Sequence, residues 1–326
     1  MIVGVLGCGD ISKEFMSASR NADVEVKAVY HREFEKASAF AESYGLERAY
    51  DDYDSFLAQE DVDTVYVGLP NSLHYPFAKK AMQAGKNVLI EKPFCSNLRE
   101  FDDLVNTSRA NNVYLIEMDR VTSMPNFAIV RDRLGELGKI RACQLDFSKY
   151  SRKYDAYLAG EHVNVFDSAF SGGALADLGV YLVNFVVALF GKPHSLIYVA
   201  DKLETGVDIT GVLVMKYPEM IVSITNSKNS IGDMVTTIQG EKGTFRLGTT
   251  PSVFSTVDKI SKAGTERISV DQEFDGSTYT LMEMKRIIDN DDKAAGEIRL
   301  AQSRKVMEVL QSARKSAGIV FKADEA

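Results

Sequence analysis

A glycine-rich loop between an apolar run and a helical segment constrains the fold of this chain most strongly. Residues 2–6 are apolar apart from one glycine, as expected for a buried parallel strand, and residues 12–19 predict a short helix. The loop between them, Gly7-Cys8-Gly9-Asp10-Ile11-Ser12, matches the pattern Gly-x-Gly-x-x-small. Its first glycine permits a tight turn, and its second lets a pyrophosphate approach the backbone at the helix N-terminus. The motif alone would fit a simple turn, but its place between strand and helix predicts that residues 7–11 bind a dinucleotide.

The region up to about residue 119 alternates between predicted strands and helices. Further strands are predicted at 24–30, 64–69, 87–90 and 113–117, and further helices at 33–43 and 74–84. Such alternation indicates right-handed crossovers and a parallel, doubly wound sheet that is covered on both faces. We therefore expect an α/β Rossmann domain over residues 1–119.

The pattern changes after residue 119. Segments 140–147, 195–203, 207–217 and 221–226 alternate apolar and polar residues, and 234–247 contains a hairpin signal. Helices are predicted at 174–189, 279–289 and 297–313. These features predict an α+β domain over residues 120–326 with a large, mostly antiparallel sheet, which we expect to bind substrate and mediate oligomerisation. A chain of 326 residues is long enough for two such domains.

Composition narrows the range of partners. The formal net charge of −8 argues against nucleic acid and anionic membranes as binding partners. The apolar N-terminus is too short for a signal peptide, and the longest apolar run, 180–190, is too short for a membrane span. Three cysteines without paired spacing predict neither disulfides nor a metal site. We expect a cytoplasmic protein that binds no metal.

The end of the second predicted strand bears on the choice of dinucleotide. An acidic residue at this point usually binds the ribose hydroxyls of NAD, but this strand ends in His31-Arg32, with no acid before Glu33. A guanidinium can pair with the 2′-phosphate of NADP through a forked contact. The sequence therefore favours NADP, with His31 and Arg32 beside the cofactor. NAD stays possible if Arg32 is only a solvated surface residue.

Two further motifs follow predicted strands of the first domain. They are Leu69-Pro70-Asn71-Ser72-Leu73-His74 and Glu91-Lys92-Pro93, and both lie at carboxyl ends of strands, where parallel sheets bind ligands. Together with the glycine loop, they resemble the Gfo/Idh/MocA oxidoreductase family. The resemblance implies a cis Lys92–Pro93 peptide and a Lys92 aimed at the nicotinamide and substrate. It also implies cofactor contacts from Leu69, Pro70, Asn71, His74 and Glu91, although His74 would equally suit a helix cap or internal packing.

A segment of the second domain, 172–184, resembles the second signature of the family. Asp177, Tyr181 and Asn184 lie at helical spacing on an otherwise apolar helix, so they share one face. Polar groups on such a stripe need partners, which a hydroxyl-rich substrate or a buried polar network would supply. Many relatives carry His and Asp where this chain has Tyr181 and Asn184. The tyrosine is similar to that of glucose-fructose oxidoreductase and the dimeric dihydrodiol dehydrogenases.

The resemblance implies an NADP(H)-dependent hydride transfer at a carbinol or carbonyl carbon of a sugar, polyol or trans-dihydrodiol. Tyr181 is the expected proton donor and acceptor, because a nearby Lys92 would favour its phenolate. Asp177 would orient the substrate hydroxyl or hold Lys92 charged. The alternative is that Lys92 carries the proton and Tyr181 only orients the substrate.

Other kinds of protein could be built on the same fold. A non-catalytic NADP-binding regulator and an NAD-dependent glycosidase of the same family are the competing hypotheses. The expected partners are a small polyhydroxylated substrate and a second copy of the chain, in a homodimer or homotetramer.

Overall fold

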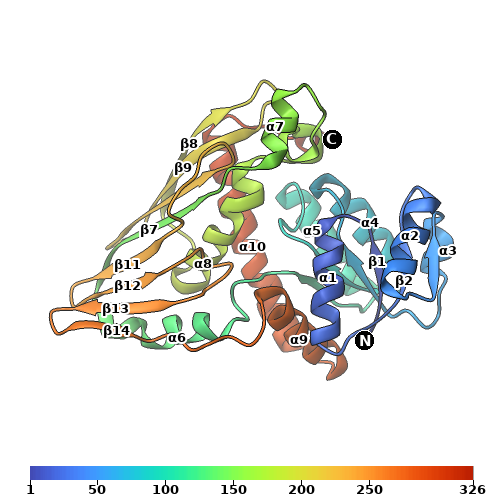
Figure 1. Ribbon diagram of the computed structural model, residues 1–326, viewed down its shortest axis with the longest axis horizontal. Helices are drawn as coiled ribbons and strands as arrows, with labels where there is room; N and C mark the ends of the chain where they lie inside the picture. The colour runs from blue at the N-terminus through green and yellow to red at the C-terminus, as the bar shows by residue number, and fades with distance from the viewer. Residues whose placement is uncertain (326) are drawn as a thin grey trace. The chain divides into compact units, whose positions relative to one another are not determined.

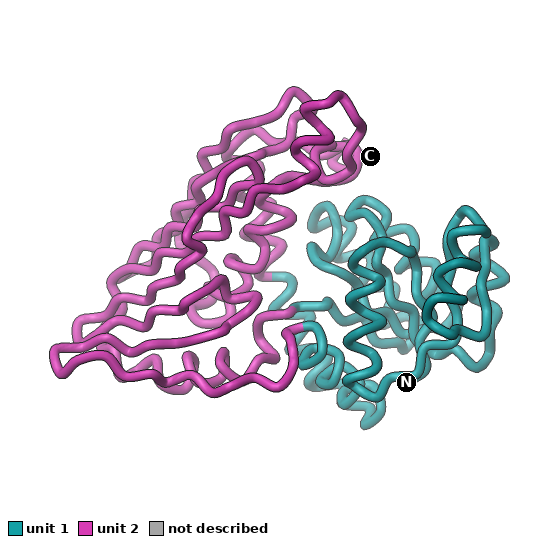
Figure 2. Tube along the Cα trace, viewed as in Figure 1, with its two compact units in different colours: residues 1–119, 277–304 teal, residues 120–276, 305–326 magenta. Residues whose placement is uncertain are grey.

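The computed structural model describes residues 1–325, which divide into two compact units (Figure 2). Unit 1 contains Met1–Asp119 and Ser277–Arg304, and unit 2 contains Arg120–Gly276 and the residues from Lys305 onward. The predicted division into 1–119 and 120–326 differs from this grouping at residues 277–304. The reason is that Leu281, Met284 and Ile287 are buried in the apolar core of unit 1.

Unit 1 is built on a six-stranded parallel sheet (Figure 1). The strand order is β3-β2-β1-β4-β5-β6, which is the doubly wound order of a Rossmann fold and confirms the predicted class. The strands are β1 Ile2–Leu6, β2 Glu25–Tyr30, β3 Arg48–Tyr50, β4 Thr64–Val67, β5 Asn87–Ile90 and β6 Leu115–Glu117.

The helices of unit 1 bury their apolar faces against this sheet. They are α1 Asp10–Asn21, α2 Phe34–Tyr44, α3 Tyr53–Leu57, α4 Asn71–Gln83, α5 Leu98–Ala110, α9 Gly276–Asp289 and the first half of α10 Lys293–Ser316. One representative core contact is the stacking of Phe15 from α1 on Tyr66 from β4, with ring centroids 3.9 Å apart. Both side chains are almost completely buried, so α1 is fixed firmly over β4.

Unit 2 contains an eight-stranded sheet in the order β14-β13-β12-β11-β7-β10-β9-β8. Only β10 and β7 pair in parallel, which confirms the mostly antiparallel sheet that the sequence predicts. The strands are β7 Ile140–Ser148, β8 Ser195–Lys202, β9 Asp208–Lys216, β10 Ile221–Ser227, β11 Thr236–Gly240, β12 Thr244–Leu247, β13 Val257–Ser261 and β14 Gly264–Arg267.

The helices of unit 2 include α6 Pro125–Arg133, α7 Arg152–Leu158 and α8 Val180–Phe190. Buried residues of α8 and of the second half of α10 form the core with one face of the sheet (Figure 1). On the other face, β8 and β9 leave Ile197, Val199, Val212 and Val214 exposed. The sheet is therefore covered on one face within the unit.

The apolar segment Ser168–Phe190 is the one helix within residues 1–325 that is long and apolar enough to cross a membrane. Of its most apolar stretch, 72% is buried inside the protein. A core helix of a soluble protein meets the same two criteria, and the burial accounts for the apolar sequence. The three cysteines are free thiols, and Cys95 and Cys143 are buried.

Candidate active site

The glycine loop leaves the N-terminus of α1 open. Helix α1 begins at Asp10, and Gly9, which precedes it, provides no side-chain cap for the backbone N–H groups. The φ angle of Gly9 is −78°, which any residue can adopt, and a Cβ at this position would meet no atom within 4 Å. The protein itself therefore does not require glycine here. A pyrophosphate that approaches the helix N-terminus does require it, so the loop fits the predicted dinucleotide.

Gly7 directly follows β1, at the point between β1 and β4 where the strand order of the sheet reverses. Its φ angle is +94°, and a Cβ would come within 2.8 Å of the Gly68 carbonyl oxygen. Ser12 fills the third position of the motif and is fully buried, with its Oγ 3.0 Å from where a Cβ of Gly68 would lie. A small residue is thus needed at each of these positions, because the exits of β1 and β4 and the start of α1 lie close together.

The end of β2 presents a cation that is largely exposed to solvent. The Arg32 side chain is 84% exposed, and its Nε lies 3.7 Å from Glu33 Oε1. Glu33 also pairs with Lys36 at 2.9 Å, and this contact holds the pKa of the Glu33 carboxyl below its usual value. The negative charge of Glu33 is therefore compensated by Lys36, while the Arg32 guanidinium is exposed to solvent. His31 uses Nδ1 to accept a hydrogen bond from the Glu33 backbone N–H at 3.0 Å.

Cys8, in the middle of the glycine loop, is partly buried. Burial raises the pKa of its thiol to about 11, so the thiol is neutral at physiological pH. Its contribution to cofactor binding would come from the backbone of the loop rather than from a thiolate.

The side chains of two residues that the sequence predicts as cofactor contacts are hydrogen-bonded inside the protein. His74 on α4 is fully buried, and its ring nitrogens lie 2.8 Å from the Leu69 carbonyl oxygen and 2.9 Å from that of Pro93. The Glu91 side chain is 3% exposed and accepts a hydrogen bond from the Tyr66 hydroxyl at 3.0 Å. His74 thus makes the contacts of an internally packed side chain, and its contact with the cofactor stays a prediction. Asn71 begins α4 after Pro70, at the carboxyl side of β4.

Lys92 follows β5 and is half-buried. The Lys92–Pro93 peptide bond is cis, as the family resemblance implies. The backbone N–H of Lys92 donates to Glu91 Oε2 at 3.2 Å.

In unit 2, the polar stripe belongs to a helix that begins irregularly. Residues Leu175–Gly179 form a π-helical turn, which continues into α8. Such turns inside helices occur often at functional sites, and this one contains Asp177. Tyr181 is half-buried with its ring centroid 6.1 Å from that of Phe147, and Asn184 is 5% exposed.

Asp177 has a partner that the sequence analysis missed. Lys228, which directly follows β10, forms an ion pair with the Asp177 carboxylate. The lysine side chain is 7% exposed and that of the aspartate 33% exposed, so one group is inside the protein and the other reaches its surface. The sequence does contain one sign of a polar site, because an otherwise apolar strand ends in Asn226-Ser227-Lys228. This pattern does not identify Asp177, 51 residues away, as the partner of Lys228.

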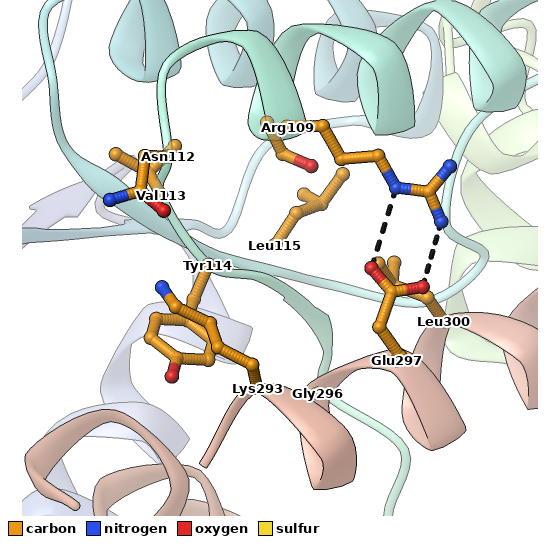
Figure 3. A pocket seen from close by; sticks show the side chains of 10 residues that line it. Arg109, Asn112, Val113, Tyr114, Leu115, Lys293, Gly296, Glu297 and Leu300 are labelled. Atoms are coloured by element: carbon orange, nitrogen blue, oxygen red, sulfur yellow. Dashed lines mark hydrogen bonds and ion pairs between the residues drawn. The ribbon is translucent and has the colours of Figure 1, made fainter. Parts of the chain in front are cut away.

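A pocket of about 170 Å³ lies elsewhere in unit 1, at the start of β6 (Figure 3). Lys293 lies 4.0 Å from the centroid of the Tyr114 ring, and Arg109 pairs with Glu297 at 2.7 Å. Because parallel sheets bind ligands at the carboxyl ends of their strands, this pocket is at the wrong end of β6 for the cofactor. Within residues 1–325 no group of three or more His, Cys, Asp or Glu side chains is arranged to hold a metal ion.

Comparisons with known proteins agree with this description. Residues 1–118 match an oxidoreductase family with an NAD-binding Rossmann fold, and residues 132–246 match the GFO/IDH/MocA C-terminal domain. The chain is 31% identical to the scyllo-inositol 2-dehydrogenase (NADP(+)) IolU of Bacillus subtilis, over 99% of this chain and 98% of that one. It is 27% identical to the bovine trans-1,2-dihydrobenzene-1,2-diol dehydrogenase, over 99% and 98% of the two chains.

Among solved structures, the fold is similar to that of KijD10, a 3-ketoreductase from Actinomadura kijaniata in complex with NADP and TDP-benzene. The TM-score is 0.84 at 23% identity, over 97% of each chain. The fold and the glycine loop together define an NAD(P)-dependent dehydrogenase or reductase. The chain belongs to the Gfo/Idh/MocA family of oxidoreductases, and the resemblance found in the sequence motifs is confirmed.

Proposed function

We propose that this protein catalyses NADP(H)-dependent oxidation of a CH–OH group, or the reverse reduction, in a sugar, polyol or trans-dihydrodiol. The single observation that carries the proposal is the open N-terminus of α1 beside Gly9, at the carboxyl edge of the parallel sheet. Support for the substrate class comes from the relatives, one named for scyllo-inositol and another for a dihydrobenzenediol.

The preference for NADP is supported by the exposed Arg32 and by the ion pair that compensates the charge of the neighbouring Glu33. A free carboxylate would repel the 2′-phosphate, but Glu33 already pairs with Lys36. Residues of the glycine loop would bind the pyrophosphate, and Arg32 would bind the 2′-phosphate. IolU, whose name specifies NADP(+), is consistent with this choice.

We propose that Tyr181 carries the proton transfer of the reaction and that Lys92 acts together with it. The nicotinamide supplies hydride exchange when it is bound. An alcohol that gives up a hydride must also lose its hydroxyl proton, and a phenol accepts that proton well only when a cation favours the phenolate. Lys92 would be that cation.

Asp177 would orient the substrate, because its ion pair with Lys228 keeps it as a carboxylate that only accepts hydrogen bonds. A hydroxyl next to the reacting carbon is a suitable donor for it. This role for Asp177 favours substrates that carry several hydroxyl groups. Asn184, which is 5% exposed on the same helix, stays a predicted substrate contact.

The proposal is tested with purified protein, NADP or NAD, and scyllo-inositol, glucose and a trans-dihydrodiol as substrates. We expect accumulation of reduced nicotinamide in absorbance, faster with NADP, for at least one of them. A glycosidase would cleave a glycosidic bond without net accumulation of reduced cofactor. A regulator would bind NADP but turn over no member of the panel, which would contradict the proposal.

We also propose that the protein self-associates through the exposed face of β8 and β9. Two registered pairs on this face, Ile197 with Val214 and Val199 with Val212, place four branched side chains together in solvent. We favour a second copy of the chain as the partner of this surface, because a twofold contact needs only one such patch on each copy.

Light scattering on Val199→Lys should give monomers where the wild type gives dimers or tetramers. Val320→Lys, at another exposed valine, should leave the mass unchanged. A monomeric wild type would exclude this surface as an interface.

The cytoplasm is the location we propose. Three free thiols fit a reducing compartment, which also holds the nicotinamide cofactors such an enzyme uses.

A further inference from the structure

The backbone of three consecutive residues after β5, Lys92, Pro93 and Phe94, is held by buried polar side chains. The N–H of Lys92 donates to Glu91 Oε2 at 3.2 Å. The carbonyl oxygen of Pro93 lies 2.9 Å from His74 Nδ1. The backbone of Phe94 is hydrogen-bonded to the carboxyl group of Glu117. Glu91 directly follows β5, His74 lies in α4 and Glu117 ends β6, so different parts of unit 1 converge on one short loop.

Two of these side chains, Glu91 and His74, are themselves anchored on their other side. Glu91 Oε1 accepts from the hydroxyl of Tyr66, whose ring stacks on Phe15. The second ring nitrogen of His74 lies 2.8 Å from the Leu69 carbonyl oxygen. Either neutral tautomer of the ring donates to one of its two carbonyl groups, and the imidazolium donates to both. The loop that contains Lys92 is therefore tied to α1, to β4 and to the exit of β4.

Burial of these polar groups costs hydration free energy. Their presence therefore needs a reason that apolar residues could not supply. His74 is fully buried, and Glu91 and Glu117 are 3% and 4% exposed. Apolar side chains of similar size would fill the same space without the loss of hydration that a buried imidazole or carboxyl suffers. What apolar side chains cannot do is hydrogen-bond a backbone that lies outside any helix or strand. The polar residues therefore have their use in fixing that backbone.

We propose that Glu91, His74 and Glu117 form a backbone clamp whose function is to position Lys92. They would act through the main chain of residues 92–94, without contacting cofactor or substrate. The inference rests on the proposed catalytic role of Lys92. It replaces the expectation that His74 and Glu91 bind the cofactor directly.

The test uses two mild variants of the full-length protein and a matched control. Tyr66→Phe removes the hydroxyl that anchors Glu91 and keeps the ring on Phe15, while Glu91→Gln weakens the contact to Lys92 N–H. The control, Tyr53→Phe, removes another hydroxyl of unit 1, which donates to the Phe77 carbonyl at 2.9 Å.

The first measurement needs no substrate. Acetic anhydride labels free amines, and mass spectrometry gives the labelling rate of Lys92 against pH, with Lys285 as internal reference. We expect each clamp variant to change the Lys92 rate by roughly threefold or more, because a displaced main chain moves the amine into different surroundings. The Tyr53→Phe control should leave it unchanged.

The second measurement is turnover on whichever member of the substrate panel is active. We expect kcat to fall about tenfold or more in both clamp variants, because small displacements of a reacting group are costly in rate. The Kd for NADP should stay within about twofold, since the clamp does not touch the cofactor.

Two results would overturn the clamp. One is unchanged Lys92 labelling in both variants, with a loss of stability like that of Tyr53→Phe. The other is weaker NADP binding with unchanged labelling, which would make the residues cofactor contacts. Failure of the proposed function is a separate result, because it would appear as full activity in Lys92→Met while the labelling data still decide the clamp.

Discussion

Lys228 forms an ion pair with Asp177 while only 7% of the lysine side chain is exposed. The pair joins the end of β10 to the π-helical turn before α8, so it links the sheet of unit 2 to the helix that carries Tyr181. Removal of one partner from such a pair leaves the other without its counter-charge. The proposed role of Asp177 as a hydroxyl acceptor would therefore depend on Lys228.

Replacement of this lysine should affect both stability and substrate use. We expect Lys228→Met to lower the free energy of unfolding by about 1–3 kcal/mol and to raise KM for the hydroxylated substrate, with NADP binding unchanged. Urea unfolding and steady-state kinetics measure these effects. Lys192→Met breaks a more exposed pair with Glu308 in the same unit and should change stability by no more than about 0.5 kcal/mol. Equal changes in stability and KM for the two substitutions would show that the Lys228–Asp177 pair matters no more than an exposed ion pair.

A side chain at Gly9 should block the cofactor without harming the fold. Space for a Cβ is open there and the φ angle is ordinary, so Gly9→Val should keep the wild-type melting temperature. In a fluorescence titration it should show no measurable NADPH binding. Gly7→Val is the contrasting variant, because φ of +94° and the nearby Gly68 carbonyl predict loss of stability as well. Wild-type cofactor binding by Gly9→Val would refute the assignment of the loop.

The exposed arginine after β2 should select between the two cofactors. Arg32→Ala removes a charged contact worth about 1.5–3 kcal/mol, so the Kd for NADP should rise roughly tenfold or more while that for NAD barely changes. Calorimetric titration with both cofactors measures this. Arg109→Ala, at an exposed arginine remote from β2, serves as the control. A wild-type preference for NAD, or equal losses for both cofactors, would contradict the prediction.

Glu117 should make stability depend on pH. Burial raises its pKa to about 8 from an ordinary value of 4.5, with Asp119 and Glu91 adding to the rise. Because the unfolded chain loses this proton near pH 4.5 and the folded protein keeps it until about pH 8, the contribution of Glu117 to stability is present below pH 4.5 and declines as the pH rises to 8.

The neutral variant Glu117→Gln removes this titration. Its free energy of unfolding relative to wild type should therefore increase between pH 5 and pH 8.5, by about 1 kcal/mol or more. Urea unfolding at the two pH values measures the difference, with the exposed Glu60→Gln as control. A difference between variant and wild type that is the same at both pH values would show that Glu117 does not titrate in this range.

The parts of the structure that could be read from the sequence are those with strong local patterns. Strand β1 matches its predicted bounds, because a buried parallel strand leaves a continuous apolar run. By contrast, all four residues of β14 are exposed, so this strand has no apolar alternation to reveal it. Helix α9 was foreseen as a helix, but nothing local says that Leu281 is buried in unit 1 rather than unit 2.

The residues of the candidate site also fall into two groups, those recognised from local motifs and those whose contacts depend on the fold. The glycine loop and the Lys92–Pro93 step are short motifs whose meaning is local. The contacts of His74, Glu91 and Asp177 are not, because each partner comes from another element of the fold. Sequence can indicate that a polar residue is in an important place. It cannot say whether its side chain faces a ligand or the interior of the protein.

The central claim is that Lys92 and Tyr181 carry the proton transfer together, and a double-mutant comparison tests it most directly. Lys92→Met and Tyr181→Phe should each lower kcat by about 10² or more, while Tyr181→Phe still binds NADP. Because residues that act as a unit are non-additive, the double variant should lose little beyond the worse single variant. Fully additive losses would separate the two residues and leave Lys92 as the sole proton carrier. A Tyr181→Phe enzyme with near-normal kcat on its true substrate would contradict the account.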